Sequence, residues 1–550
     1  MLPEPRVVSV YLLCLFLIGL GYIAITPPFE GFDEPAHFAS IRLIADVGTI
    51  PLYGKSSLPK DVAEYRGPMS YSSVNMPFGS GLTYREFFAK PELVDRFILE
   101  YRQPHPHPAY EPSNETDWEA QQPPFYYAVL APVLRLIEPA DLLTQILALR
   151  IASYLMALVG IFFGFLAIPR TSSIIDPRVA VTGYLFYPLM LPMFFPEFAR
   201  LGNDSMCLLL AGVAAYFLNR QLADERRVVW PVALGVTLGL GLLTKAFYLM
   251  IVVSIGLFLL VRLWCARHDK VAWRSGWRNG FIVLVLAVAI GGGWYVYNLV
   301  VNGDLFGDAE SIALVNNGGL LAPMWAGLKQ YFSLYLLARN LLALFVSWVW
   351  AGTWSYVRMA PPLYVPLLLL VIVTCGAFIA TLLRRARLND PSWLPVFLHA
   401  VFASPLLYHV LVVVAHNGEG GTGAWYMHML IPWSAPALGL GIATLTERTW
   451  SRRLFVALSI YAALFQAMVV WSQIALFTGC AIKDDSKTYA FPSRLFCLDQ
   501  SRTVFDHLAI IGWPILAGIG FGGGLACAAW LVLRRRLEVP TVAITREERN

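Results

Sequence analysis

The sequence predicts an all-α polytopic membrane protein, a bundle of about 12 transmembrane helices with a long extracytoplasmic first loop that carries surface helices. Hydrophobic residues make up 57% of the 550 residues and charged residues only 14%, whereas a soluble chain carries about 25% charged residues. Apolar runs near the ~20 residues that cross a bilayer recur along the whole length. This number of charged residues is too small to cover a protein surface in water. Most of the chain is therefore expected to face lipid.

Twelve apolar segments are predicted to span the membrane. They cover residues 7–26, 149–168, 178–198, 205–219, 229–244, 247–264, 280–301, 362–383, 393–415, 425–446, 453–477 and 508–533. The first is interpreted as a retained helix, because only Arg6 precedes it and no Ala-x-Ala-like cleavage site follows it.

Basic residues fall in every second connection between these spans. They are Arg6; Arg170 and Arg178; Arg220, Arg226 and Arg227; Arg262, Arg267, Lys270, Arg274 and Arg278; Arg384, Arg385 and Arg387; Arg448, Arg452 and Arg453; and Arg534, Arg535 and Arg536. The positive-inside rule then places both termini in the cytoplasm and the first loop outside. Basic stripes with interleaved aromatics are absent outside the loops, so no nucleic-acid partner is expected.

Two further apolar segments are not counted as spans. Residues 123–137 would form only about 20 Å of helix, short of the ~30 Å hydrocarbon core. Counting them would also invert every later loop against the charge rule. Residues 331–352 contain Arg339 and Asn340. Both segments are therefore predicted to lie on the outer surface or to re-enter the membrane.

Four regions follow from these assignments. Residues 1–301 hold the first span, the outer loop 27–148 and spans two to seven; 302–361 form an outer segment with a surface or re-entrant helix; 362–536 form a C-terminal transmembrane module; and 537–550 form a cytoplasmic tail. Cys480 and Cys497 share one polar outer loop and are expected to pair only if that loop faces an oxidising space.

The segment Asp33–His37 begins seven residues after the first span and holds two carboxylates and an imidazole. Ionisable groups so close to a bilayer are costly to desolvate and indicate function. Pro35 suits the first turn of a helix, so an amphipathic surface helix is predicted over 35–47, with Asp33 or Glu34 as its cap. The alternative is that Asp33 only caps this helix. A cap uses one carboxylate, however, and does not explain why Glu34 and His37 stand so near the bilayer.

A second polar cluster runs from Glu197 to Ser205 at the outer end of the third span, and it holds Glu197, Arg200, Asn203 and Asp204. The alternative for Asp204 is a cap on the fourth helix. Arg200 and Asp204 nevertheless reach the same outer face as Asp33, which favours a common site.

Further polar side chains are predicted to face outward. Gln121 and Gln122 are suited to sugar hydroxyls, and Tyr426 and His428 border a glycine-rich turn. Arg339 and Arg358 are candidates for an anionic headgroup, because a guanidinium binds phosphate through a fork of donors, and Lys245 lies between two short spans. The alternatives are snorkelling of Lys245 and simple interfacial anchoring of the two arginines.

No metal or other cofactor is predicted. His105 and His107 flank a proline without an evident third ligand, which disfavours zinc. A divalent ion held by Asp33 and Asp204 stays an open alternative, since carboxylates suit such ions.

The arrangement resembles the GT-C superfamily of integral-membrane glycosyltransferases over roughly residues 1–300. The motifs that carry it are Asp33-Glu34, Gln-Pro-Pro-Phe-Tyr-Tyr at 122–127, Asn203-Asp204, Leu243-Thr244-Lys245, and 294–298 running into Gly303-Asp304. Protein mannosyltransferases and the lipid A aminoarabinose transferase carry a similar Asp-Glu and a Pro-Pro-aromatic surface helix. The sequence looks closest to uncharacterised bacterial relatives of that superfamily.

The resemblance implies a polyprenyl-phosphate sugar donor and Asp33 as general base on an acceptor hydroxyl, with Glu34 as a second catalytic group. The residues expected to bind substrate are His37, Gln121, Gln122, Asn203, Asp204, Tyr426 and His428. Cations near the leaving lipid phosphate are expected among Arg200, Lys245, Arg339 and Arg358. Gln122 stands where the aminoarabinose transferases have Lys, so a phosphate contact there does not carry over.

The expected function is an inverting glycosyltransferase of the inner membrane, acting on a glycan, lipid or protein acceptor at the extracytoplasmic face among membrane lipids. The alternative is a transporter or flippase of a lipid-linked sugar, and a catalytically inactive scaffold is a third. Transport favours charges near mid-membrane and paired broken helices. This chain concentrates its acids at one interface, which favours surface chemistry.

Overall fold

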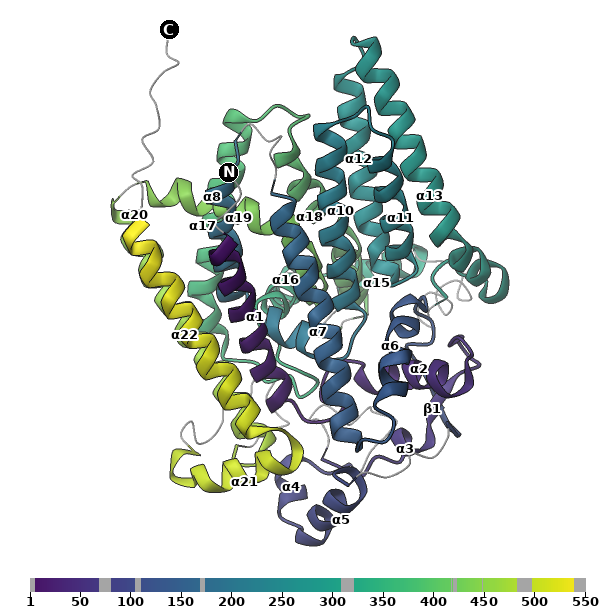
Figure 1. Cartoon of the computed structure of the whole chain (residues 1–550), viewed down its shortest axis with the longest axis vertical. Coiled ribbons are helices and arrows are strands. Elements are labelled where there is room, and N and C mark those ends of the chain that lie inside the picture. The colour runs from purple at the N-terminus through teal and green to yellow at the C-terminus, as the bar shows by residue number, and fades with distance from the viewer. Residues whose placement is uncertain are drawn as a thin grey trace.

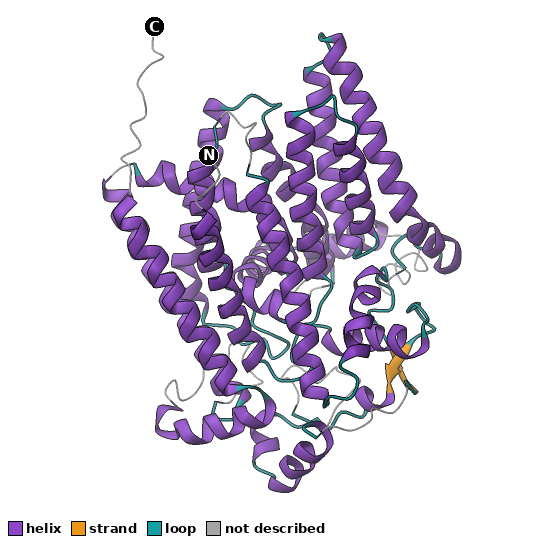
Figure 2. Cartoon of the chain, viewed as in Figure 1, coloured by secondary structure: helices purple, strands orange, loops and turns teal. Residues whose placement is uncertain are grey.

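The computed structural model describes residues 5–68, 81–103, 110–168, 174–307, 321–416, 418, 423–447, 449–481 and 497–538. Over these residues the protein is a bundle of long helices with one small antiparallel pair of strands at one end (Figures 1 and 2). The predicted fold class, an all-α polytopic membrane protein, is confirmed.

The helices of the bundle run roughly along its long axis (Figure 1). They are α1 (Pro5–Ile25), α7 (Leu142–Leu166), α8 (Pro177–Met190), α10 (Asp204–Ala223), α11 (Val229–Leu242), α12 (Leu249–Cys265), α13 (Lys270–Asn302), α17 (Val365–Arg385), α18 (Leu394–Ala415), α19 (Ile431–Thr446), α20 (Thr449–Phe477) and α22 (Pro514–Glu538). Short 3-10 segments connect or extend them: η2 (Ala246–Tyr248), η3 (Pro361–Tyr364), η4 (Pro391–Trp393), η5 (Ala424–Leu430) and η6 (Cys497–Gln500).

Ten segments of the described chain are long and apolar enough to cross a membrane. The predicted spans 178–198 and 229–244 do not meet this measure, because they form helices α8 and α11 of only 14 residues each. Such helices measure about 21 Å. After α8, which contains Pro188, the chain continues into the separate short helix α9 (Phe194–Ala199). The residues at this break are apolar and buried in protein. The sequence therefore reads as one continuous apolar run although the helix is interrupted there.

The predicted re-entrant segment is a bent pair of helices. α15 (Leu321–Tyr331) and α16 (Leu334–Val349) meet at 117°, as in a broken span or a re-entrant loop. Helix α6 (Phe125–Leu136) has 12 residues and falls short of a span, as its length in the sequence predicted.

The long first loop folds into small elements gathered at one end of the bundle (Figure 1). Besides α6, these are α2 (Glu34–Val47), α3 (Lys60–Ala63), α4 (Tyr84–Phe88), α5 (Pro91–Tyr101) and the antiparallel strands β1 (Ser57–Pro59) and β2 (Pro112–Thr116). Helix α21 (Ser501–Ile511) lies at the same end, whereas α1 begins, α22 ends and α12 turns into α13 at the other end.

The first loop is tied to the C-terminal part of the chain. The Arg102 guanidinium donates hydrogen bonds to the carbonyls of Ala509 and Ile510 at the end of α21, over 3.0 and 2.9 Å. It also lies 4.7 Å from the ring centre of Trp513. Helices α1 and α22 pack so closely that a Cβ on Gly520 would lie 2.5 Å from the backbone nitrogen of Gly21. The first and last helices therefore share one bundle.

Helix α2 matches the predicted helix 35–47 in position but not in exposure. It is buried from Glu34 to Leu43, and of its residues only Asp46 and Val47 are exposed. It packs against α6 and β1. The prediction of an amphipathic surface helix is therefore wrong, and the acidic motif at its start is enclosed by protein.

Candidate functional site

Asp33 directs its carboxylate away from the helix it precedes. It occupies the N-cap position of α2 but makes no side-chain capping bond. Its Oδ1 instead accepts a hydrogen bond from Nε1 of Trp118 over 3.0 Å. No described residue makes a hydrogen bond or ion pair with Oδ2, and the side chain is half-buried. The capping alternative therefore does not account for Asp33.

Asp33 is also one of three non-glycine residues with a left-handed backbone in the described chain. Its φ is 58°, and those of Phe29 and Tyr356 are 63° and 45°. Such conformations cost on the order of 1–3 kcal/mol each and concentrate at functional sites. The ring of Tyr356 lies 5.4 Å from that of Phe32, so all three strained residues belong to one region.

Glu34 is fully buried and paired with Arg150 of α7. Nε and Nη2 of Arg150 donate to its two oxygens over 2.7 and 2.6 Å. The backbone N–H of Leu201 adds a third bond of 3.0 Å. Arg150 also donates to the carbonyls of Thr26 and Pro27, over 2.6 and 2.7 Å. Glu34 therefore anchors the Asp33 segment to α7, and the catalytic role predicted for it stays a prediction.

The second predicted cluster forms a buried ionic quartet of Glu197, Arg200, Asp204 and Lys245. Arg200 donates to Glu197 and to Asp204, each over 2.9 Å. Nζ of Lys245 donates to both oxygens of Asp204 over 2.9 and 2.8 Å. Arg200 also donates to the carbonyl of Phe32 over 2.8 Å. The structure thus brings Asp204 close to Asp33, with Arg200 as the link.

The quartet excludes the simpler alternatives for its members. Helix α10 begins at Asp204, yet the Asp204 oxygens bind side chains rather than capping the helix. Lys245 is buried at 5% exposure and does not snorkel. Its ammonium lies 4.4 Å from the ring centre of Tyr426, a cation–π distance that brings Tyr426 into the site. Two carboxylates balance two cations, so neither cation is unpaired.

His37 lies beside a buried carboxyl next to Asp33. Its Nδ1 is 3.0 Å from the hydroxyl of Tyr127 and 3.9 Å from Oε2 of Glu119. Burial and the positive charges of Arg200 and Lys245 hold the pKa of His37 well below its usual range, so its imidazole is neutral. Burial and the charge of Asp33 hold the pKa of Glu119 well above its usual range.

Asp117 extends this acidic group. It accepts hydrogen bonds from Oγ of Ser40 over 2.8 Å and from the backbone N–H of Glu119 over 3.0 Å. Burial nevertheless raises its pKa to about 7. Carboxyls whose environments push their pKa values apart in one site can divide acid and base roles.

Arg358 is one of the cations predicted to bind the lipid phosphate, and one of its hydrogen-bond donors has no partner among the described residues. Its guanidinium lies 4.9 Å from the ring centre of Tyr356, and its Nε is buried without a partner among the described residues. Burial and the nearby charge of Asp33 raise the pKa of the Tyr356 phenol, and Arg358 opposes that rise. Both charges therefore lie near Tyr356. Arg339, by contrast, is exposed on α16.

The predicted amide residues lie next to these charges. Gln121 and Gln122 are half-buried, and Oε1 of Gln122 has no partner in the described chain. Nδ2 of Asn203 donates to the carbonyl of Thr244 over 3.3 Å, whereas its Oδ1 is buried and unpaired among the described residues. Buried acceptors without partners are rare and call for a ligand or water.

His428 is held inside the bundle by both ring nitrogens. Nδ1 lies 3.1 Å from the hydroxyl of Tyr187 and Nε2 lies 3.0 Å from the carbonyl of Trp348. The side chain is fully buried. These contacts favour a role in packing, and the substrate-binding role predicted for His428 stays a prediction.

Three residues that support the site were not singled out from the sequence: Glu30, Trp118 and Arg150. Arg150 stands at the start of the predicted span 149–168. A charge inside an apolar run is a recognised signal of function and could have identified it. Trp118 carries no comparable signal, because its role depends only on its distance from Asp33.

In the part of the chain that the structure describes, no three His, Cys, Asp or Glu residues are grouped as metal ligands. His105 and His107 lie outside the described residues. The oxygens of Asp204 accept hydrogen bonds from Arg200 and Lys245, and a cation shared by Asp33 and Asp204 stays an open alternative.

A protein family described as "Predicted membrane protein (DUF2142)" matches residues 16–423. The chain belongs to this family. The matched region of this DUF2142 protein includes Asp33, the ionic quartet and Arg358, and ends before Tyr426 and His428. No functionally curated protein matches the sequence.

Three solved structures are similar to this DUF2142 protein. ArnT from Cupriavidus metallidurans bound to undecaprenyl phosphate is 14% identical, with a TM-score of 0.45 over 96% of this chain and 78% of that chain. The same protein in the apo state is 17% identical, with a TM-score of 0.36 over 86% and 74%. AglB from Archaeoglobus fulgidus, in complex with an inhibitory peptide and a dolichol-phosphate, is 13% identical, with a TM-score of 0.40 over 90% and 57%.

Proposed function

We propose that this DUF2142 protein is an inverting glycosyltransferase that uses a polyprenyl-phosphate-linked sugar, with Asp33 as general base. The observation that carries the proposal is the state of the Asp33 carboxylate. Trp118 holds one oxygen, and the other has no partner among the described residues. The acids Glu34, Glu197 and Asp204 are held in ion pairs. A general base needs an oriented carboxylate with an unoccupied lone pair.

The proposed reaction is a single displacement. The acceptor hydroxyl transfers its proton to Oδ2 of Asp33 as its oxygen forms a bond to the anomeric carbon of the sugar. The bond from that carbon to the phosphate oxygen breaks at the same time, and the lipid phosphate leaves with the electron pair. Attack opposite to the leaving group inverts the anomeric configuration.

Arg358 is proposed as the main contact to the leaving phosphate. Its buried Nε lacks a partner among the described residues, and its charge lies with that of Asp33 around Tyr356. Removing such a contact would cost on the order of 3 kcal/mol in the transition state. Arg200 and Lys245 add to the positive field, although their donors already bind acids.

The unpaired carbonyl oxygens of Gln122 and Asn203 are proposed to accept hydrogen bonds from sugar hydroxyls. Tyr426, held by Lys245, and His37 complete the proposed substrate contacts. The acceptor is a hydroxyl of a glycan, lipid or protein, and the reaction as written uses no metal.

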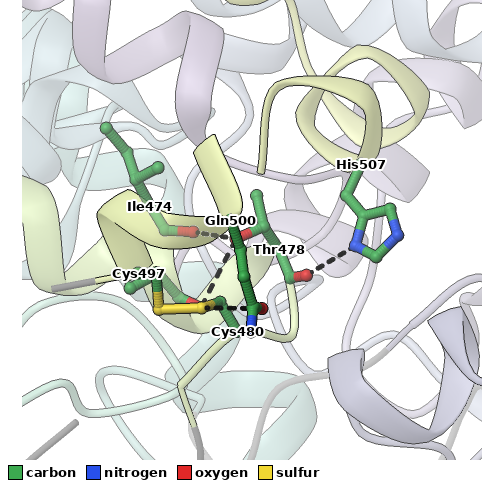
Figure 3. Close-up of a disulfide and its surroundings, with 7 residues drawn as sticks. Ile474, Thr478, Cys480, Cys497, Gln500 and His507 are labelled. Atoms are coloured by element: carbon green, nitrogen blue, oxygen red, sulfur yellow. Dashed lines mark hydrogen bonds between the residues drawn. A yellow bond between two sulfur atoms is a disulfide. The ribbon is translucent and has the colours of Figure 1, made fainter. Parts of the chain in front are cut away.

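The site is proposed to face the extracytoplasmic side of a bacterial-type inner membrane. The basic connections support this sidedness, because α1 begins and α22 ends opposite the first loop (Figure 1). A disulfide between Cys480 and Cys497, with Cα atoms 6.3 Å apart, follows α20 (Figure 3). Disulfides persist in oxidising compartments, so this loop is expected outside the cytoplasm.

The test is sugar transfer by purified protein in lipid nanodiscs, with synthetic polyprenyl-phosphate sugars as donors. Asp33→Asn should lower transfer by about 10²–10⁴-fold and leave donor binding within a few-fold of the wild type. Asp95→Asn, an exposed carboxylate on α5, is the matched control and should change neither quantity. Unchanged transfer in Asp33→Asn would overturn the mechanism. Movement of the lipid between leaflets without cleavage would support a flippase instead.

A further inference from the structure

Glu30 is a buried carboxyl three residues before Asp33 that the proposed reaction does not use. It is 1% exposed. Its Oε1 accepts hydrogen bonds from the hydroxyl of Thr353 over 2.6 Å and from the backbone N–H of Ser355 over 2.7 Å. Its Oε2 accepts from the hydroxyl of Tyr84 over 2.5 Å. The carbonyl of Glu30 also accepts from the backbone N–H of Trp354 over 3.0 Å.

These bonds join segments that lie far apart in the sequence. Thr353 and Ser355 belong to residues 350–360, a stretch between α16 and η3 without regular helix or strand. Tyr84 opens α4 in the first loop. The partners stand 323, 325 and 54 residues from Glu30. Glu30 therefore fastens the stretch 350–360 to the first loop.

The fastened stretch carries the groups proposed to act on the donor. Arg358 stands three residues beyond Ser355, and Tyr356 lies between them with its strained φ of 45°. A residue held in that conformation persists only when surrounding contacts enforce it. Other bonds of this stretch run within it or to other elements of the bundle. Nε1 of Trp350 donates to the carbonyl of Val357 over 2.7 Å, and the backbone N–H of Met359 donates to the hydroxyl of Tyr364 over 3.1 Å.

We propose that Glu30 is a positioning residue that holds Arg358 in place beside Asp33. The inference rests on the proposed function, in which Arg358 meets the lipid phosphate. Glu30 itself touches no reacting atom and acts through the backbone of Trp354 and Ser355.

The chemistry of the carboxylate suits this role. All three side-chain bonds have Glu30 as the acceptor, which an ionised carboxylate satisfies without a proton of its own. Burial raises the pKa of Glu30, and its three donors oppose the rise. A buried acid retained at this cost is explained by the bonds that it makes.

Two substitutions of Glu30 distinguish the effect of its hydrogen bonds from the effect of its negative charge. Glu30→Gln keeps a carbonyl oxygen for Thr353 and Ser355, and its NH₂ can donate to the Tyr84 hydroxyl. Glu30→Leu fills a similar volume but removes every acceptor. Thr353→Val removes one donor only, and serves where Glu30→Leu does not fold.

The experiment measures backbone amide exchange and binding of undecaprenyl phosphate in nanodiscs. In Glu30→Leu the amides of Trp354 and Ser355 should exchange at least about 10-fold faster, and the lipid phosphate should bind about 10-fold more weakly. Glu30→Gln should stay within about threefold of the wild type, and Thr353→Val should be intermediate. Glu225→Leu is the control, since Glu225 accepts from Arg262 and Ser275 near the turn into α13.

Unchanged exchange in Glu30→Leu would overturn the inference, as would faster exchange with unchanged binding of the lipid phosphate. Loss of binding in Glu30→Gln equal to that in Glu30→Leu would overturn it too, because charge rather than position would then be responsible. If the wild-type protein binds no polyprenyl phosphate, the proposed function fails instead. The exchange rates alone then report whether Glu30 holds the stretch.

Discussion

The indole Nε1 of Trp118 donates a hydrogen bond of 3.0 Å to Oδ1 of Asp33, 85 residues earlier in the chain. The bond fixes the carboxylate plane and leaves Oδ2 without a partner among the described residues. Orientation of a catalytic group by a hydrogen bond on its other atom is the logic of known catalytic triads. Trp118 is therefore expected to orient the base rather than to bind the donor.

Replacing Trp118 with Phe should lower sugar transfer about 10-fold, because a hydrogen bond worth roughly 1–1.5 kcal/mol is lost while the ring remains. Binding of the polyprenyl-phosphate sugar should change less than twofold. Steady-state transfer and donor binding in nanodiscs measure both. Trp264→Phe, an exposed tryptophan near the end of α12, is the control. Full transfer activity in Trp118→Phe would show that Asp33 needs no such orientation.

The buried pair of Glu34 and Arg150 should be among the costliest to break. Arg150→Met leaves an uncompensated carboxylate and is expected to lower the unfolding free energy by about 3–5 kcal/mol. The double variant Glu34→Leu/Arg150→Met should lose less than the sum of the single variants. Thermal unfolding in detergent gives both comparisons.

The exposed pair of Arg96 and Glu100, 2.7 Å apart on α5, provides the control for that prediction. Arg96→Met should change stability by less than about 1 kcal/mol. Equal losses at the buried and the exposed pair would contradict the anchoring role of Glu34.

Asp117 should make stability depend on pH. Its pKa is raised from the usual value of 3.8 to about 7. The folded protein therefore keeps a proton that the unfolded chain releases, so stability falls as pH rises from about 4 to about 7. The full effect is on the order of 4 kcal/mol, and below pH 4 it is absent.

Asp117→Asn should remove this contribution, so its stability relative to the wild type should rise over the same pH interval. Its amide can still serve Ser40 and the backbone N–H of Glu119. Unfolding in detergent between pH 4.5 and pH 8 measures the difference. Parallel curves for the two proteins would mean that Asp117 is ionised in the folded state.

The disulfide between Cys480 and Cys497 should be present in cells and contribute to stability. The cysteines are 17 residues apart, and closing such a loop is worth about 3 kcal/mol. The double variant Cys480→Ser/Cys497→Ser should unfold at a lower temperature. Maleimide labelling in intact cells should modify neither cysteine before reduction.

Cys265, exposed at the end of α12 on the opposite end of the bundle, is the matched control for labelling. It should be labelled without a reductant, but only after the cytoplasm is opened. Labelling of Cys480 and Cys497 in that same cytoplasmic fraction would reverse the proposed orientation of the site.

The sequence predicted that Asp33 and Asp204 lie on one face, because both acids stand at ends of apolar runs that the charge rule assigns to the same side. In the structure Arg200 contacts both Asp204 and the carbonyl of Phe32, next to Asp33. The sequence also singled out Lys245, Arg358 and Tyr426 by the same reasoning. The sequence did not distinguish the contacts of Glu34 from those of Asp33. The two are adjacent in sequence, and only the guanidinium of Arg150, 116 residues away, distinguishes them.

Differences between the predicted and the observed helices have a similar cause. Apolar composition alone marked 178–198 and 229–244 as spans, and these segments form helices α8 and α11 of 14 residues each. The pattern of helix 35–47 predicted a solvated face, yet the helix is buried from Glu34 to Leu43. Hydropathy measures how favourable it is to transfer a segment out of water. That transfer can end in the protein interior as well as in lipid, so hydropathy alone does not tell the two apart.

The sequence by itself determined the helical membrane fold, the alternation of basic connections and the end of the bundle that gathers acidic side chains. These properties follow from the transfer of single residues out of water, which composition encodes directly. Only the tertiary structure decided which acids are held in ion pairs, which carboxylate keeps an oxygen unoccupied by the described chain, and which cation stands near it. Those outcomes depend on distances between residues up to 325 positions apart, and such distances are set by how the helices pack.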